Sequence, residues 1–122
     1  MSVRAEVCLA KEEGSVLYLT LNRPAVRNAL NTELLSVLTA QFERIDPRCT
    51  HAVVFEGAGD GFSAGQDLGE LPALAAHQGV PETELDLGRV LEEGYLPLIH
   101  AIDKCEVPVI AAVHGSVVGA GL

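Results

Sequence analysis

Basic residues are scarce in this sequence. Its 122 residues include 8 Lys and Arg against 17 Asp and Glu, which gives a formal net charge of −9 at pH 7. A protein that binds nucleic acid neutralises phosphates with a basic surface, so this composition argues against a nucleic-acid partner. An anionic ligand would have to be held by a few local cations and by backbone N–H groups.

Long apolar runs are also missing. The longest, residues 107–113, contains Pro108 and is much shorter than the ~20 residues that a membrane-spanning helix needs. The first residues lack a basic segment followed by a long apolar stretch, so no signal peptide is visible. We therefore expect a cytoplasmic protein with no membrane partner.

Cysteine occurs only three times, as the widely separated Cys8, Cys49 and Cys105. An odd number of distant cysteines does not fit a disulfide framework or a zinc site built from paired cysteines. We expect reduced thiols that pack as small buried apolar side chains, and no metal site.

The overall composition is that of a globular protein, with 48% hydrophobic and 20% charged residues. Strand patterns alternate with helical ones, which indicates an α/β layered fold in a single domain over residues 1–122. The expected elements are strands at 6–10, 16–21, 51–55 and 107–113, and helices at 31–45 and 89–104. We further expect a hairpin turn at 11–14, a kink at Pro97, and a mobile surface connection over 70–88.

Two glycine-rich segments, residues 57–65 and 115–121, each follow an expected buried strand. Each ends where the chain is expected to turn into a helix. The first N–H groups of a helix have no intrahelical partner, and glycine allows a ligand to approach the backbone closely. The two segments therefore indicate either an anion or oxyanion site or merely two tight turns, and these features alone leave both open.

Three motifs occur in order along the chain. The first is Leu-Asn-Arg-Pro at 21–24 with Asn-Ala-Leu-Asn at 28–31, and the second is Gly-Phe-Ser-Ala-Gly-Gln-Asp-Leu at 61–68. The third is Pro-Val-Ile-Ala-Ala-Val-His-Gly at 108–115 with Gly-Ala-Gly at 119–121. Together they resemble the enoyl-CoA hydratase/isomerase (crotonase) family. The resemblance implies the crotonase-like (ClpP/crotonase) α/β fold, a spiral of repeated ββα units, of which residues 1–122 would form the N-terminal part.

The same resemblance implies roles for individual positions. The backbone N–H groups of Gln66 and Ala120 would be the two donors of an oxyanion hole that binds a thioester carbonyl oxygen as it becomes an enolate. Arg27 is expected either to contact a phosphate of coenzyme A or to be a solvated surface arginine. The remaining expected substrate-binding positions are Ala64, Gly65, Asp67, Leu68 and Gly119.

The sequence departs from the family pattern at three places. Ala120 stands where the family often has glycine, which is acceptable if its φ stays negative. His114 replaces a common asparagine, and we expect a buried, hydrogen-bonded histidine rather than a catalytic one. The catalytic glutamates of the family's hydratases would follow Leu122, so we expect residues 1–122 alone to be inactive. The carboxylates Asp60, Asp67, Glu70, Glu92 and Glu93 match no catalytic position and are interpreted as surface or turn charges.

The expected function is that of an enzyme, an enoyl-CoA hydratase (a lyase) or isomerase acting on an acyl-CoA thioester. Coenzyme A would enter as part of the substrate, with no separate cofactor, and the family implies a homo-oligomer, a trimer or hexamer. Residues 66–68 resemble both general hydratases and the branch that acts on ring substrates derived from phenylacetyl-CoA. A non-catalytic acyl-CoA-binding or structural fragment remains an alternative. A serine hydrolase, with Ser63 in a G-x-S-x-G pattern, is a more remote one.

Overall fold

The computed structural model describes residues 6–122. Within them, four strands form one sheet in the order β1-β2-β3-β4. Strands β1 (Cys8–Glu13) and β2 (Val16–Leu21) form an antiparallel hairpin. Strands β3 (Ala52–Gly57) and β4 (Val109–Ala111) continue the sheet in parallel with β2. The predicted α/β fold is therefore present, although β4 is shorter than the sequence pattern indicates.

The hairpin turn is tighter than predicted. Strand β1 runs through residues 11–13, and the ladder pairs Glu13 with Val16, so Gly14 and Ser15 alone make the turn. Gly14 has φ 60°, which suits the mirror-image turns that connect twisted antiparallel strands in two residues. The predicted turn at 11–14 was wrong because charged side chains are well tolerated on an exposed edge strand.

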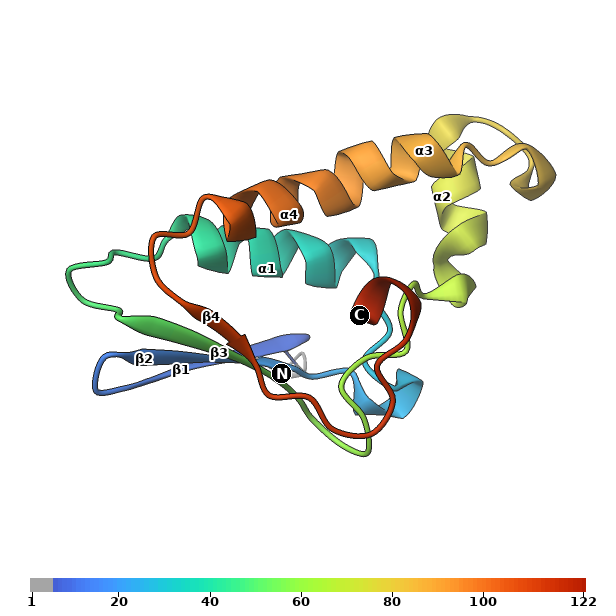
Figure 1. Ribbon diagram of the computed structural model, residues 1–122. Helices are drawn as coiled ribbons and strands as arrows, with labels where there is room; N and C mark the ends of the chain where they lie inside the picture. The colour runs from blue at the N-terminus through green and yellow to red at the C-terminus, as the bar shows by residue number, and fades with distance from the viewer. Residues whose placement is uncertain (1–5) are drawn as a thin grey trace, which may run out of the picture.

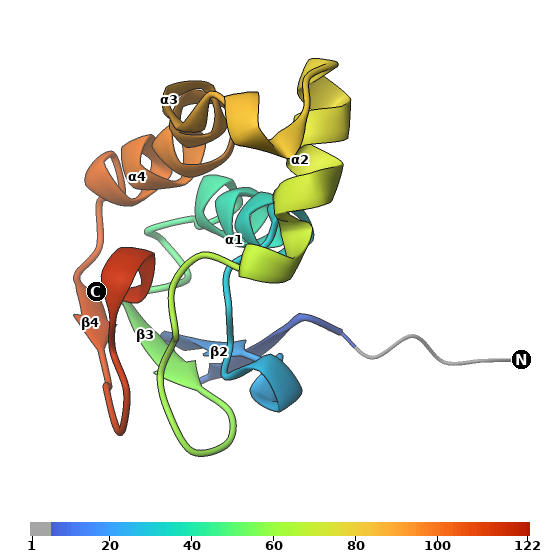
Figure 2. The ribbon, with the colours of Figure 1, turned by 90° about the vertical axis from the view of Figure 1, so that its right-hand side faces the viewer.

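The helices lie on one face of the sheet (Figures 1 and 2). Helix α1 (Thr32–Glu43) connects β2 to β3, and the connection from β3 to β4 contains α2 (Leu71–Gln78) and a longer helix. Crossovers between parallel strands are almost always right-handed. Because the strand order also advances in one direction, both crossovers are expected on the same face, and the chain forms the beginning of a spiral.

Helix α1 begins where the sequence predicts it. Asn31 is its N-cap, and the Asn31 side chain accepts a hydrogen bond of 2.9 Å from the Leu34 N–H. The apolar stripe is buried at Leu34, Leu38 and Phe42. Ile45, which we expected on the same stripe, lies beyond the last helical residue and is only partly buried.

The longer helix comprises α3 (Leu87–Val90), a π-helical turn (Leu91–Tyr95) and α4 (Leu96–Asp103), which follow one another as one rod in Figure 1. Pro97 lies in the first turn of α4. A proline has no N–H to donate and clashes with the carbonyl one turn earlier. The wider π turn just before Pro97 relieves both conflicts, so the predicted irregularity at Pro97 appears as a π bulge.

The prediction of a mobile connection over residues 70–88 was wrong for its first half. Helix α2 occupies Leu71–Gln78, Ala75 is buried, and Gly79 caps the helix end with φ 73°. Alanine favours helix strongly. However, so short an alanine-rich segment carries no clear apolar stripe from which periodicity could have revealed it.

The core lies between the sheet and the helices. Buried residues alternate along β2 and β3, as expected for strands that are covered on one face. Leu19, Leu34 and Val53 are completely buried, and the Phe42 and Phe55 rings stack with their centroids 5.5 Å apart. None of the helices in residues 6–122 combines the length and apolarity needed to span a bilayer.

The three cysteines are free thiols in different surroundings. Cys8 is buried, and burial, together with the charge of Glu6, raises the pKa of its thiol to about 11. Cys105 is half-buried. Cys49 is exposed, so the expectation that all three pack as buried apolar side chains was wrong at this position.

Candidate functional site

Three loops meet at one edge of the sheet. Loop 22–31 follows β2, loop 58–67 follows β3 and loop 112–122 follows β4. Because these three strands are parallel, their carboxyl ends lie at the same edge, where ligands commonly bind in open α/β sheets. The three sequence motifs contribute to these loops, and this explains how segments far apart in the chain form one site. Figure 2 shows loops 58–67 and 112–122 descending side by side.

Loop 22–31 is joined to loop 58–67 by Asn28, which is completely buried. The Asn28 side chain donates to the carbonyls of Ala58 (2.8 Å) and Gly61 (3.0 Å) and accepts from the Arg23 N–H (2.8 Å). The backbone of Asn28 has φ 55°, which asparagine adopts more readily than most residues. This residue therefore fixes the shape of one loop against the other.

A second link is the ion pair between Arg23 and Asp67, whose closest atoms are 2.9 Å apart. Both side chains are about one-fifth exposed, at 18% and 19%. The Arg23 guanidinium also donates to the Ala29 carbonyl, and the Asp67 carboxylate accepts from the Gly69 N–H. The sequence interpretation of Asp67 as a surface or turn charge is incomplete, because this carboxylate braces the site.

The peptide between Gly65 and Gln66 has a defined orientation. The Gly65 carbonyl accepts from the Leu30 N–H at 2.7 Å, and the Asp67 N–H donates to the Leu30 carbonyl at 2.9 Å. In a trans peptide the C=O and N–H groups point in opposite directions. The Gln66 N–H therefore points away from Leu30, and it has no acceptor among residues 6–122.

Loop 112–122 runs against loop 58–67. Val117 pairs with Ser63 in a parallel bridge, and the Val118 N–H donates to the Ser63 carbonyl at 3.2 Å. Gly65, with φ 90°, allows a close approach, because a methyl group there would lie 3.0 Å from the Val118 carbonyl oxygen and 3.3 Å from the Ala120 nitrogen. Only glycine meets both the conformation and the spacing.

Ala120 belongs to a short 3-10 turn, Gly119–Gly121. Its φ lies outside the left-handed region, as expected, whereas Gly119 has φ 55°. The Ala120 N–H has no acceptor within the described residues. Two backbone donors without partners, those of Gln66 and Ala120, thus belong to loops that touch each other. Such a pair can stabilise an oxygen that acquires negative charge.

Two cavities adjoin these donors. An apolar cavity of about 230 Å³ lies between α1, α4 and the end of loop 112–122, and its lining includes Ala120, Ser63 and Tyr95. A second cavity, of about 320 Å³, lies under α2 and is lined in part by Gln66 and Glu70. In residues 6–122, no three His, Cys, Asp or Glu side chains gather in a way that could hold a metal ion.

Tyr95 was not identified from the sequence. Its hydroxyl donates to the Gln66 side-chain oxygen at 2.5 Å, across 29 positions of the chain. Burial raises the pKa of Tyr95, and the charge of Glu70 adds to this effect, so the hydroxyl keeps its proton at neutral pH. Nothing in the sequence marks this tyrosine except its place just before Leu96 and Pro97, where the helix is irregular.

Ser63 does not resemble an activated nucleophile. Its side chain is buried, donates to the Asn28 carbonyl at 2.9 Å and accepts from the Gly65 N–H at 3.2 Å. Within residues 6–122, no histidine forms a hydrogen bond with this hydroxyl. The serine of the G-x-S-x-G pattern holds the loop together and is not placed as a nucleophile elbow requires.

Two other expectations concern exposed residues. His114 is hydrogen-bonded, with its Nε2 2.8 Å from the Gly59 carbonyl oxygen, but it is exposed; the predicted burial was wrong. Arg27 is also exposed, and its carbonyl accepts from the Ala64 N–H at 2.9 Å. Leu68 is 73% exposed. The structure thus brings most predicted positions together and leaves the Arg27 and Leu68 side chains on the surface.

Comparison with known proteins shows the family of this chain. The family model described as enoyl-CoA hydratase/isomerase matches residues 11–122. The chain belongs to the enoyl-CoA hydratase/isomerase family. The resemblance noted from the three motifs is thereby confirmed.

Individual relatives agree with the family assignment. A probable enoyl-CoA hydratase of Rhodobacter capsulatus is 44% identical over 103 residues, covering 84% of this chain and 36% of the relative. The 1,2-epoxyphenylacetyl-CoA isomerase of Escherichia coli is 40% identical, covering 95% of this chain and 43% of the relative. The chain therefore spans about two fifths of the length of these curated relatives.

Solved structures of the enoyl-CoA hydratase/isomerase family share the fold. A crystal structure of an enoyl-CoA hydratase/carnithine racemase from Magnetospirillum magneticum superimposes with a TM-score of 0.82 at 32% identity. The match covers 97% of this chain and 42% of that one. The crotonase-like fold class is therefore confirmed.

Proposed function

We propose that this chain supplies the oxyanion hole of an enzyme that hydrates or isomerises an acyl-CoA thioester. The Gln66 and Ala120 N–H groups would bind the thioester oxygen while it becomes an enolate. The observation that carries the proposal is the pair of free backbone donors on two touching loops beside an apolar cavity. Fixed donors of this kind need no reorganisation when charge develops on the substrate, so they favour the transition state over the ground state.

The coenzyme A portion of the substrate would lie along loop 58–67. The family resemblance assigns the backbone of Ala64, Asp67 and Leu68 to this path, and the exposed side chain of Leu68 leaves its neighbourhood accessible. In a chain of net charge −9, the exposed Arg27 is a suitable cation for a phosphate. Relatives named as enoyl-CoA hydratases and isomerases support a CoA thioester as the substrate class. That no further cofactor takes part is itself part of the proposal.

We further propose that the groups that move protons are contributed by residues beyond Leu122. Hydration and double-bond migration both need a positioned carboxylate. Asp67 is held by Arg23, and both carboxylate oxygens of Glu70 accept from the Thr32 N–H at 3.0 and 3.1 Å. Asp67 thus supports the end of loop 58–67 and Glu70 the start of α1, so neither carboxylate is free to act as a base.

A chromophoric substrate analogue tests the oxyanion hole directly. The thioester 4-dimethylaminocinnamoyl-CoA absorbs at longer wavelength when its carbonyl is polarised, so its spectrum reports the hole without turnover. We expect a red shift on binding to residues 1–122, and none for free 4-dimethylaminocinnamate. Binding without a spectral shift would favour the alternative of a non-catalytic CoA-binding fragment, and no binding would contradict the proposal.

A second experiment tests the origin of the acid and base. Residues 1–122 are compared with the same chain extended to the length of its relatives, with a short trans-2-enoyl-CoA as substrate. We expect turnover only in the extended chain, because each general acid or base contributes roughly 10²–10⁴-fold. Robust hydration by residues 1–122, abolished by Asp67→Asn or Glu70→Gln, would mean that one of these carboxylates does the chemistry.

A further inference from the structure

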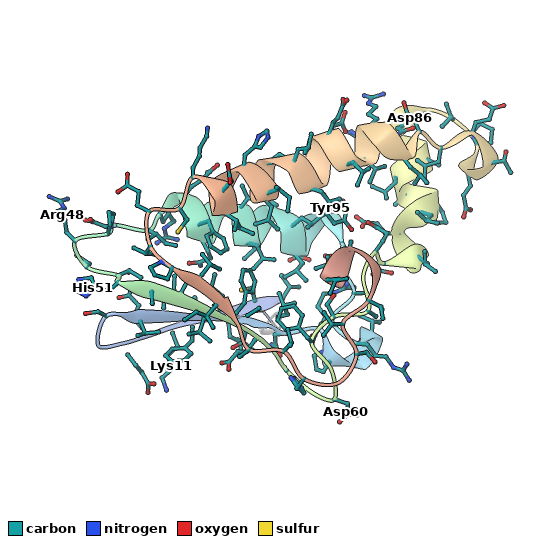
Figure 3. The ribbon with its side chains drawn as sticks, in the orientation of Figure 1. Lys11, Arg48, His51, Asp60, Asp86 and Tyr95 are labelled. Carbon is teal, nitrogen blue, oxygen red and sulfur yellow. The ribbon has the colours of Figure 1, made fainter. Side chains whose placement is uncertain are left out.

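Tyr95 lies at the site, but the proposed function has so far given its side chain no role. The ring of Tyr95 lines the apolar cavity that Ala120 also lines, and the Tyr95 hydroxyl donates to the Gln66 side chain. Figure 3 shows Tyr95 on the side of the long helix that faces α1 and the C-terminal turn. One side chain is thus in contact with the surroundings of both proposed donors.

The position of Tyr95 follows from the helix irregularity. Tyr95 is the last residue of the π-helical turn that precedes Pro97. A π turn is wider than an α-helical turn and therefore changes the direction of its side chains, and π bulges are frequent at functional sites. The turn therefore directs the hydroxyl across to loop 58–67, 29 positions earlier in the chain.

The Tyr95 contact holds the side chain of Gln66, whereas Leu30 holds the backbone on either side of it. Leu30 holds the peptide units on either side of Gln66 through the Gly65 carbonyl and the Asp67 N–H. The Gln66 side chain is held separately: its oxygen accepts from Tyr95, and its amide donates to the Asp67 carbonyl at 3.2 Å. Together these bonds hold Gln66 between loop 22–31 and the long helix.

We propose that Tyr95 is a positioning residue that holds the Gln66 N–H in line with the Ala120 N–H by binding the Gln66 side chain. The inference rests on the proposed function, since it concerns the geometry of that oxyanion hole. The tyrosine acts through Gln66 and exchanges no proton with the substrate. Removing its hydroxyl keeps both backbone donors and their bonds to Leu30 but releases the Gln66 side chain, so the Gln66 N–H is held in its orientation less firmly.

The test measures the absorption band of bound 4-dimethylaminocinnamoyl-CoA in four chains: unsubstituted, Tyr95→Phe, Gln66→Leu and the double variant. Tyr95→Phe keeps the ring that lines the cavity and removes only the hydroxyl. We expect a smaller red shift and a Kd that rises roughly threefold to tenfold, as for the loss of one hydrogen bond. Because Tyr95 acts through Gln66, the double variant should lose no more than either single variant.

Tyr18→Phe is the matched control, because Tyr18 is the only other tyrosine and lies in the middle of β2, outside the three loops. This variant should leave the spectrum unchanged, and thermal unfolding should confirm that all variants fold. An unreduced shift in Tyr95→Phe, or losses that add in the double variant, would overturn the positioning role alone. Absence of any shift in the unsubstituted chain would overturn the proposed function, and the role of Tyr95 with it.

Discussion

The two proposed donors lie in segments that are built differently. Gln66 lies in loop 58–67, which is tied to loop 22–31 by the buried Asn28 and by the ion pair of Arg23 with Asp67. Ala120 lies in loop 112–122, most of whose residues are exposed. That loop is held to its neighbour by backbone contacts with Ser63 and by the close approach of Gly65.

The difference separates two ways of holding a backbone donor. In loop 58–67, side chains from elsewhere in the sequence fix the backbone, so the loop keeps its shape as long as those buried polar groups remain paired. In loop 112–122, small residues allow the backbone to lie against loop 58–67, so close packing and backbone hydrogen bonds decide its position. Substitutions in the first region should therefore affect folding, whereas those in the second should affect mainly the site.

The largest expected effect is on protein stability, when the link between loops 22–31 and 58–67 is removed. Asn28→Ala leaves the Arg23 N–H and the carbonyls of Ala58 and Gly61 without their buried partner. Since each unsatisfied buried group costs ~1–3 kcal/mol, we expect the free energy of unfolding to fall by about 4 kcal/mol. Urea denaturation measures this loss. Asn22→Ala, which removes one exposed hydrogen bond to the Glu6 carbonyl, is the control and should cost less than ~1 kcal/mol. If both variants lost a similar amount of unfolding free energy, the buried side chain of Asn28 would not be what holds the two loops together.

The next effect separates the backbone donor of Gln66 from its side chain. Gln66→Pro removes the N–H and keeps the backbone bonds of the flanking groups to Leu30. Like Gln66→Ala, it also loses the side-chain contact with Tyr95. We expect the red shift of the cinnamoyl thioester to disappear, and kcat to fall roughly 100-fold in a catalytically complete chain. Gln66→Ala keeps the donor and should lose only the severalfold contribution of the Tyr95 contact. Equal losses in both variants would show that the side chain, not the N–H, contacts the substrate.

A smaller effect on stability, with a clear effect on the site, is expected in loop 112–122. A methyl group at Gly121 would lie 2.7 Å from the Cβ of Ser63, so the exposed loop has to move away. We expect Gly121→Ala to lower the free energy of unfolding by only about 1 kcal/mol while it reduces the red shift. Gly88→Ala, in helix α3 with its nearest neighbour at a side-chain oxygen of Asp86, should change neither. A large loss of stability in Gly121→Ala would mean that this loop is braced as strongly as the other.

The smallest expected effect is at the surface. Arg27→Gln removes an exposed cation next to loop 58–67, and we expect the Kd of the CoA thioester to rise severalfold at low salt and less at high salt. Arg48→Gln changes the net charge equally at an arginine that is 88% exposed outside the three loops. A titration at two salt concentrations compares them. Equal changes in both variants would assign the effect to net charge and leave Arg27 as a solvated arginine.

Much of this protein follows from local patterns in its sequence. Short runs of strand-forming and apolar residues predict the strands. The stripe of Leu34, Leu38 and Phe42 after Asn31 and Thr32 predicts α1 and the place near which it begins. These features were predictable because burial on one face imposes a fixed period on neighbouring residues. The family resemblance likewise rests on short motifs, each of which can be recognised without knowledge of its neighbours in space.

The tertiary structure alone decided how those motifs act on one another. The pairing of Arg23 with Asp67, the three bonds of Asn28 and the contact of Tyr95 with Gln66 join residues 5 to 44 positions apart. No period or spacing records such contacts, because they depend on where parallel strands end and on how a π turn rotates one side chain. Whether a glycine merely turns the chain or makes room for another loop is settled in the same way. At Gly65 the fold brings Val118 and Ala120 within 3.0–3.3 Å of the position that a methyl group would take.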